Sequence, residues 1–186
     1  MELKDYSDEV ALIDTAKQDP AAFGLLYSRY VERIYRYVYF RVGGVSDAED
    51  ITSKVFVRAY QNLKRYRHLG LPFSAWLYRI AHNQVANFHR DRGRYREIAI
   101  DDMNLPDGGS WQRLPETVAV SNEETDLLMR MVNDLPEQRR ELIMLKFIHK
   151  LSNEEIAKVL DKTEGAIKSL YHRTLLELRD RMKNYG

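Results

Sequence analysis

Apolar side chains recur every three or four residues through most of this chain, which is the spacing of an amphipathic α-helix. In residues 20–41 the recurring apolar positions are Phe23, Leu26, Tyr27, Tyr30, Ile34, Tyr37 and Val38. Segments that alternate apolar and polar residues, as a half-buried β-strand does, are scarce. The pattern predicts an all-α protein.

Start and stop signals give approximate bounds for the expected helices. Asp19 followed by Pro20 is a helix cap with proline in the first helical position, and Gly43-Gly44 ends that helix. Pairs of serine and glutamate at capping-box spacing predict three further helix starts, at Ser46/Glu49, Ser121/Glu124 and Ser152/Glu155. Three more helices are expected. One begins at Ser7, one spans residues 73–89, and one begins at Pro136.

The helical pattern fails between residues 95 and 121. Residues 95–125 carry seven Asp and Glu against two Lys and Arg, and they include the turn sequence DGGS at residues 107–110. Such a composition is typical of a flexible linker. We therefore expect a helical domain over residues 7–94, an acidic linker over 95–121, and a second helical domain over 122–183.

The segment LSNEEIAKVLDKTEGAIKSLYHR, residues 151–173, has the pattern of a helix-turn-helix. Its first helix would bury Ile156, Ala157 and Leu160, and Thr163 would cap a second helix that starts after a three-residue turn. In a DNA-binding helix-turn-helix the second helix lies in the major groove. An ordinary helical hairpin has a similar pattern and is the alternative for this segment alone.

The expected second helix carries polar side chains suited to DNA. Gly165 and Ala166 at its start would let the backbone approach the duplex closely. Donors to phosphates and base edges follow, and they are Lys168, Ser169, His172 and Arg173.

Composition narrows the class of protein. Of the 186 residues, 44% are apolar and 31% are charged, and the absence of cysteine excludes disulfides, thiolate metal sites and cysteine nucleophiles. The sequence has neither an apolar run of the roughly 18–20 residues that cross a membrane nor a signal-peptide core at its start. These features predict a soluble cytoplasmic protein without membrane insertion.

The net charge of +1 is unevenly distributed. Residues 58–94 carry eight Lys and Arg against the single acid Asp91. A local excess of this size attracts a phosphate backbone whatever the total charge of the chain. A solvated basic face is the alternative interpretation of these arginines.

Three blocks in order carry a family resemblance: DAEDITSKVFVRAY at residues 47–60, FSAWLYRIAHN at 73–83, and the terminal helix-turn-helix. Together they resemble the extracytoplasmic-function (ECF, group IV) sigma factors of the sigma-70 RNA polymerase family. The resemblance implies a region 2-like helical bundle followed by a region 4-like helix-turn-helix. It also implies core RNA polymerase, promoter DNA and an anti-sigma factor as partners, an association with the nucleoid through the polymerase, and no cofactor, metal or catalytic activity.

By this resemblance, the helix from Asp47 to Leu63 would dock on the clamp helices of the polymerase β′ subunit, and the β flap is a second expected contact on the polymerase. The implied contact residues are Asp47, Glu49, Asp50 and Arg58. Acids also favour a helix N-terminus, which explains their position equally well. Ser53 and Lys54 stand where the family usually has glutamine followed by an acid.

The resemblance assigns opening of the promoter −10 element to the region around residues 66–94. A loop and the following helix would hold a base rotated out of the stack, and nearby cations would hold the displaced strand. The implied residues are Tyr66, Arg67, His68, Arg79, Asn83 and Arg90. Trp76 is more readily explained as part of the helix core than as a stacking platform for DNA.

The helix-turn-helix would read the −35 element through Lys168, Ser169, His172 and Arg173, which occupy the matching positions. Asp161 stands where glycine is common in the turn, and aspartate tolerates left-handed geometry better than most residues. Leu170-Tyr171 replaces the usual arginine followed by leucine, which removes one expected phosphate contact.

Other classes of protein remain as alternatives. A helix-turn-helix regulator that does not bind core polymerase would share the C-terminal block, and a helical adaptor would bury the same apolar stripes. A metal-dependent nuclease would use Asp47, Glu49 and Asp50, but the sequence shows no second set of acids or histidines at metal-ligand spacing.

Overall fold

The computed structural model describes residues 3–68, 70–98 and 130–183, and every element in these ranges is helical. The chain divides into two compact units, residues 1–110 and 111–186. In the first unit the elements are α1 (Leu3–Ala16), α2 (Pro20–Val42), α3 (Val45–Asn62), a 3-10 turn (Leu63–Arg65) and α4 (Phe73–Ile98). In the second they are α6 (Glu137–Ile143), a π-helical segment (Met144–Ile148), α7 (Asn153–Val159) and α8 (Glu164–Lys183).

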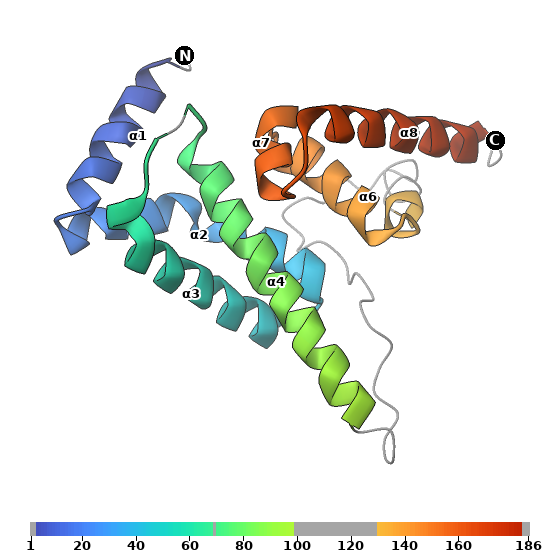
Figure 1. Cartoon of the computed structure of the whole chain (residues 1–186), viewed down its shortest axis with the longest axis horizontal. Helices are drawn as coiled ribbons and strands as arrows, with labels where there is room; N and C mark the ends of the chain where they lie inside the picture. The colour runs from blue at the N-terminus through green and yellow to red at the C-terminus, as the bar shows by residue number, and fades with distance from the viewer. Residues whose placement is uncertain (1–2, 69, 99–129, 184–186) are drawn as a thin grey trace. The chain divides into compact units, whose positions relative to one another are not determined.

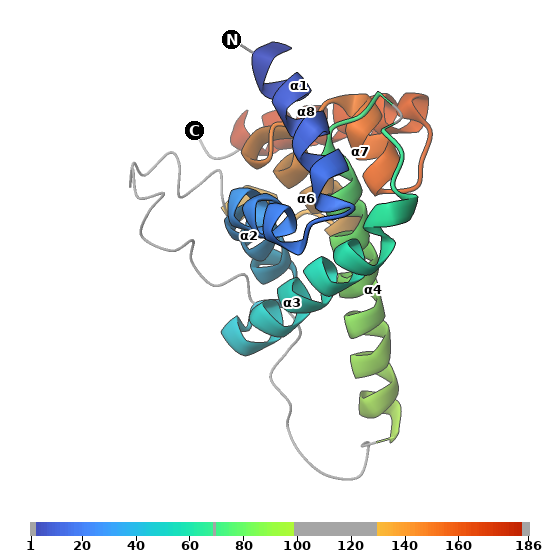
Figure 2. The ribbon, with the colours of Figure 1, turned by 90° about the vertical axis from the view of Figure 1, so that its left-hand side faces the viewer.

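In the first unit α2, α3 and α4 pack against one another, and α1 packs on α2 (Figures 1 and 2). The interior is formed by aliphatic and aromatic side chains that share one face of each helix. Fully buried examples are Leu26, Ile34, Tyr37, Val55 and Leu77. The three-to-four-residue spacing therefore marks the buried faces as predicted, except at Tyr27 of α2, which is 43% exposed.

The predicted ends of α2 are confirmed. Asp19 is the N-cap, and its side chain accepts a hydrogen bond from the backbone N–H of Ala21 at 2.9 Å, while Pro20 occupies the first turn. At the other end Gly43 takes a left-handed conformation with φ of 76°, and its N–H donates to the carbonyl of Tyr39. Glycine suits this C-cap because it has no Cβ to clash in that conformation.

The predicted capping box at Ser46 and Glu49 is wrong. The helix α3 begins at Val45, Gly44 is its N-cap, and no side chain caps this end. Since Gly43 already turns the chain and Gly44 is extended, α3 starts at once and Ser46 lies inside its first turn.

Two helices are longer than their apolar pattern indicates. The helix α1 begins at Leu3 rather than Ser7, and α4 continues to Ile98, past the predicted end at His89 and past residue 94. Residues 90–93 are all exposed, and Figure 1 shows the last turns of α4 extending beyond α2 and α3. A solvated stretch of helix buries no face, so apolar periodicity could not report it.

In the second unit a small core joins residues before α6 to the end of α8. Met131, Val132, Leu135, Ile143 and Leu178 are buried together, and Tyr171 packs against them. The predicted helix from Pro136 is confirmed, with Pro136 as its N-cap.

The helix that starts after Pro136 changes to π geometry at Met144, so its last apolar residue, Ile148, leaves the buried face. The N–H of His149 donates to the carbonyl of Met144 at 3.1 Å, five residues back. A π turn rotates the following side chains relative to an α-helix. Ile148 is accordingly 40% exposed, and Phe147 is exposed as well.

Several sequence-based expectations lie outside the described residues, including the Ser121/Glu124 capping box and the acidic linker. No helix within the described ranges is both long enough and apolar enough to cross a membrane.

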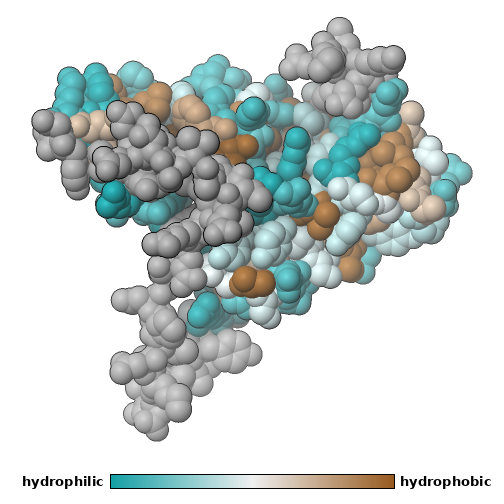
Figure 3. Space-filling view, turned by 180° about the vertical axis from the view of Figure 1, so that it is seen from behind, coloured by the Kyte–Doolittle hydropathy of each residue, from teal (hydrophilic) through white to brown (hydrophobic). Residues whose placement is uncertain are grey.

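In the face drawn in Figure 3, hydrophobic residues form small separate patches among hydrophilic ones.

Candidate nucleic-acid interface

The helix-turn-helix of the second unit starts with the predicted capping box. The Ser152 hydroxyl accepts from the N–H of Glu155 at 3.2 Å, and the Glu155 carboxylate accepts from the N–H of Ser152 at 2.5 Å. The face of α7 expected to be buried is buried, with Ile156, Ala157 and Leu160 inside the unit. The capping fixes the start of α7 and so the direction in which the turn leaves it.

The turn between α7 and α8 depends on one left-handed residue and one cap. Asp161 has a φ of 53°, the left-handed geometry that aspartate tolerates better than most residues and that suits the glycine more common at this position. Thr163 accepts from the N–H of Ala166 at 3.2 Å through its hydroxyl, which confirms it as the cap of α8. The segment is therefore a helix-turn-helix rather than a loosely joined pair of helices.

The four polar residues expected to contact DNA share the exposed side of α8. Lys168, Ser169, His172 and Arg173 are all exposed. The opposite side is buried through Ile167, Leu170, Thr174 and Leu178. Lys168 lies 2.8 Å from Glu164 one turn earlier, so a phosphate at this position would compete with that carboxylate.

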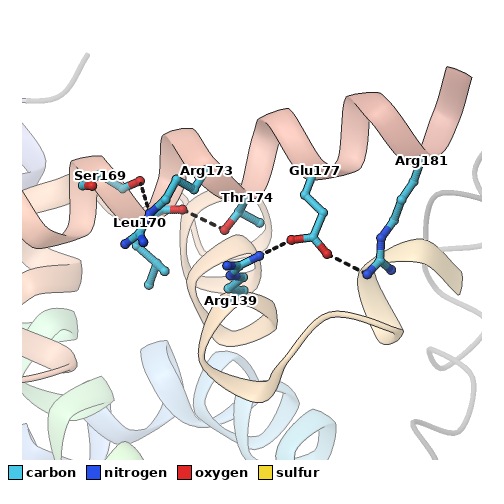
Figure 4. Close-up of polar contacts among 7 residues, drawn as sticks. All are labelled: Arg139, Ser169, Leu170, Arg173, Thr174, Glu177 and Arg181. Atoms are coloured by element: carbon cyan, nitrogen blue, oxygen red, sulfur yellow. Dashed lines mark hydrogen bonds and ion pairs between the residues drawn. The ribbon is translucent and has the colours of Figure 1, made fainter.

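Polar contacts hold α8 in place along its length (Figure 4). The Thr174 hydroxyl donates to the carbonyl of Leu170 at 2.8 Å. Further along the helix, the Glu177 carboxylate pairs with Arg139 of α6 and with Arg181 of α8 itself. The Arg139–Glu177 pair joins α8 to α6, whereas the other two contacts lie within α8, and the exposed side of α8 is left for a ligand.

Leu170 explains one departure from the family pattern. Its side chain is only 9% exposed, so it belongs to the core of the unit rather than to the polar face. The phosphate contact that arginine would make at this position is therefore replaced by packing. The neighbouring Tyr171 ring lies 6.2 Å from the ring of Phe147, against the same core.

In the first unit, α4 presents a second polar face. Arg79, Asn83 and Arg90 are exposed, and their spacing of four and seven residues places them on one side of the helix. Arg90 donates to the side chain of Asn87 at 2.5 Å. The face carries two cations and one amide whose carbonyl and NH2 groups can both take part in recognition.

The loop before α4 brings Tyr66 to the start of this helix. The Tyr66 ring lies 4.8 Å from the Trp76 ring and 5.3 Å from the Phe73 ring, and it is half-buried between them. Arg67 and His68 follow it and are exposed. Trp76 is itself half-buried, so it is neither a pure core residue nor an open platform.

The helix α3 carries the acids expected to contact the polymerase. Its buried residues Ile51, Val55 and Phe56 hold it on the core as predicted. Glu49, Asp50 and Arg58 are exposed.

Two of the acids on α3 already have cationic partners. Asp47 faces Arg92 of α4, with 4.0 Å between carboxylate and guanidinium. Lys54 pairs with Asp50 at 2.5 Å, so the unusual lysine neutralises one of the acids.

Sequence reasoning missed most of the lining of a shallow depression between α3 and α4. Its volume is about 400 Å³, and its lining residues are Ser53, Lys54, Val57, Arg58, Gln61, Asn62 and Gln84. Val57 is 53% exposed. Val57 is an apolar residue that lies outside the buried stripe of α3. An exposed apolar residue of this kind is the sequence signal that could have indicated this side of the helix as a contact surface.

Tyr78 of α4 is a buried phenol in the core of the first unit. Burial raises the pKa of Tyr78 well above its usual range, and the nearby guanidinium groups of Arg33 and Arg36 lower it in part. The phenol is therefore neutral at physiological pH. Within the described ranges no group of three or more His, Asp or Glu is placed to hold a metal ion.

Comparisons with known proteins identify the family. The profile of Sigma-70 region 2 matches residues 26–95, and that of Sigma-70 region 4 matches residues 125–178. The chain is 32% identical over 173 residues to the ECF RNA polymerase sigma-E factor of Escherichia coli, with 90% of each chain covered. This chain belongs to the ECF sigma factors of the sigma-70 family.

Other relatives agree with this membership. SigW of Bacillus subtilis is 30% identical over 184 residues, covering 90% of this chain and 92% of the relative. BldN of Streptomyces coelicolor is 37% identical over 175 residues, and here the chain covers 66% of the relative's length. As a sigma factor, the protein acts in the initiation of transcription, so the all-α two-domain prediction and the predicted function are both confirmed.

Solved structures share the fold. RpoE of Bartonella quintana, in complex with NepR, superposes with a TM-score of 0.69 at 22% identity, covering 87% of this chain and 96% of the other. CnrH, in complex with the cytosolic domain of CnrY, superposes with a TM-score of 0.65 at 23% identity over 96% of the sigma factor described here and 99% of CnrH.

Replacement of Leu170 by alanine should destabilise the second unit of this sigma factor by about 2–5 kcal/mol, because the change removes a buried side chain and leaves a cavity. Ser169→Ala, one residue away on the exposed face, should stay within about 0.5 kcal/mol of the wild type. Urea unfolding followed by circular dichroism measures both variants. Equal stability of the two variants would show that Leu170 is not a core residue.

Proposed function

We propose that this sigma factor binds core RNA polymerase, places α8 on the −35 duplex, and holds unstacked −10 bases with the loop at residues 66–68 and with α4. The observation that carries the proposal is the pair of polar faces in one chain, one on α8 and one on α4, in a member of the sigma family. The domain bounds that go with it are 7–94, 95–121 and 122–183.

At the −35 element, Lys168, Ser169, His172 and Arg173 contact phosphates and base edges. A Cβ at Gly165 would meet nothing within 4 Å beyond its own stretch of helix, so packing does not require glycine there. The absence of a side chain instead leaves the start of α8 open to close approach by a DNA backbone. This supports the placement of α8 in the major groove.

At the −10 element, Tyr66, Arg67, His68 and Asn83 form the pocket for a base that has left the stack, and Arg79 and Arg90 bind phosphates. The contacts of Tyr66 with Phe73 and Trp76 favour a rigid half-buried wall over a ring that swings freely. A rigid wall loses little entropy when a base stacks on it.

The polymerase contact is assigned to α3. Asp47, Glu49, Asp50 and Arg58 face the β′ clamp helices, and the C-terminal domain contacts the β flap. Asp47 and Asp50 are already paired with Arg92 and Lys54, whereas Glu49 has no ion pair within the described ranges, so its charge is available to the polymerase.

The free energy for strand opening comes from binding, and the protein has no catalytic activity, cofactor or metal of its own. We place it in the cytoplasm, where bacterial RNA polymerase and the nucleoid are. We also propose an anti-sigma factor as its regulator, of the kind that NepR is to RpoE of Bartonella quintana.

Binding to core RNA polymerase tests the proposal directly. The purified chain should co-elute with core enzyme in a one-to-one complex, and a known sigma factor should compete for the same site. The folded chain failing to bind the polymerase of its own host would overturn the proposal and favour a helix-turn-helix regulator that acts without core enzyme.

Lys168→Ala and Arg173→Ala should each weaken holoenzyme binding to promoter DNA about 5- to 100-fold, because each removes a cation from phosphates or base edges. Arg179→Ala is the matched control, since it removes a cation from the same side of α8 as Lys168, about 16 Å further along the helix from that residue. Binding to core enzyme should be unchanged in all three. Equal losses of DNA binding and core binding would contradict the separation of the two tasks.

Asn83→Ala should impair promoter opening more than closed-complex binding, because the amide would contact a base that is accessible only after it leaves the stack. Permanganate reactivity of −10 thymines measures opening, and an electrophoretic shift in the cold measures closed binding. Gln84→Ala is the control, because this neighbouring amide faces the α3 side. Unchanged thymine reactivity in Asn83→Ala would remove Asn83 from the melting site.

A further inference from the structure

The outer side of α2 carries a row of three arginines that the proposed function leaves unassigned. Arg29, Arg33 and Arg36 follow one another at spacings of four and three residues, which places them on one side of the helix. The opposite edge of α2 faces α3, where the Tyr27 ring lies 4.8 Å from the Phe56 ring. The arginine row therefore lies on the edge of α2 away from α3.

Aromatic contacts place this edge of α2 beside the proposed melting site. The Tyr37 ring of α2 lies 5.4 Å from the Tyr78 ring of α4. The Tyr30 ring lies 5.9 Å from the Phe73 ring, and Phe73 in turn contacts Tyr66 of the loop. A short series of rings thus joins the arginine row to the loop and to the first turns of α4.

The three arginines differ in their partners. Arg29 lies 4.0 Å from the buried carboxylate of Glu9, and Arg36 is ion-paired with Glu32. Arg33 is exposed, and no acidic side chain pairs with it among the residues that the structure describes. A charge in that position is available to a ligand.

The two buried phenols beside Arg33 do not use its charge either. Burial raises the pKa of Tyr30 far above its usual range, as it does for Tyr78, so both rings stay neutral although Arg33 lowers each pKa in part. Neutral hydroxyl groups do not pair with a cation as a carboxylate does. The positive charge of Arg33 therefore has no counterion among the residues that the structure describes.

The two flanks of α4 differ in charge. On the α3 flank Asp47 and Asp50 are each paired with a cation, whereas the α2 flank carries the row of three arginines. A DNA strand leaving the loop is attracted to such a row of cations. Arginine suits the task because its guanidinium can bind a phosphate through two parallel hydrogen bonds.

We propose that Arg33, flanked by Arg29 and Arg36, binds a backbone phosphate of the DNA strand that leaves the melting loop along α2. The inference rests on the proposed function of the loop and α4. The site lies on α2, which precedes the three sequence blocks that resemble the family.

The test uses holoenzyme reconstituted from core polymerase and the full chain. Its affinity for a fork-junction DNA with a single-stranded −10 segment is measured over a range of salt concentrations. Arg33→Gln should lower the affinity about 3- to 10-fold and reduce the slope of log K against log salt by about 0.7, the value for one single-strand phosphate. Arg33→Lys should restore most of the slope, because it keeps the charge.

Glu32→Gln provides a test with the opposite sign. Removal of its carboxylate frees Arg36, so the affinity for fork DNA should rise about 2- to 5-fold if the row binds phosphate. Lys17→Gln, which removes a cation near the start of α2, is the matched control and should leave both affinity and slope unchanged.

Affinity and slope equal to wild type in Arg33→Gln, with its fold and core binding intact, would overturn the phosphate site while leaving the proposed function in place. Loss of core binding in Arg33→Gln would assign the row to the polymerase and would also overturn the site. Failure of the wild-type holoenzyme to bind fork DNA would instead overturn the proposed function, and the phosphate site with it.

Discussion

The burial of one apolar side of α2 against α1, α3 and α4 is the constraint on which the first unit depends. Leu26, Ile34, Tyr37 and Val38 leave almost no surface exposed, and each neighbouring helix packs on part of this stripe. Burial of this area supplies the main favourable free energy of folding. It also determines which side chains face outward, and so every polar face of the unit.

Capping and turn geometry play the corresponding role in the second unit, where the core is small. Ser152, Glu155 and Thr163 satisfy backbone N–H groups that the short helices leave unpaired, and Asp161 turns the chain between them. The contacts of Glu177 then hold α8 to α6. Held in this way, α8 would lose little freedom if its polar side binds DNA as we propose.

The local distribution of charged side chains tells more about binding than the net charge of the chain does. The sigma factor has a net charge of only +1, yet residues 58–94 carry eight Lys and Arg against a single acid. Ion pairs such as Lys54 with Asp50 and Arg36 with Glu32 reduce the charge that a partner meets. A cation that has no carboxylate partner is therefore a better indicator of a binding surface than the number of arginines.

The sequence by itself determined the all-α class, the cap at Asp19, the helix-turn-helix with its Ser152/Glu155 box, and the family, because these depend on local spacing and on motifs. Tertiary structure decided what local spacing cannot report. It started α3 at Val45, rotated Ile148 into solvent through a π turn, and carried α4 past His89 as solvated helix. It also joined side chains distant in sequence, placing Tyr66 against Trp76 and leaving Arg33 without a carboxylate partner in the described part of the chain. Pairings of this kind depend on how helices pack in three dimensions, and no periodicity along one helix specifies them.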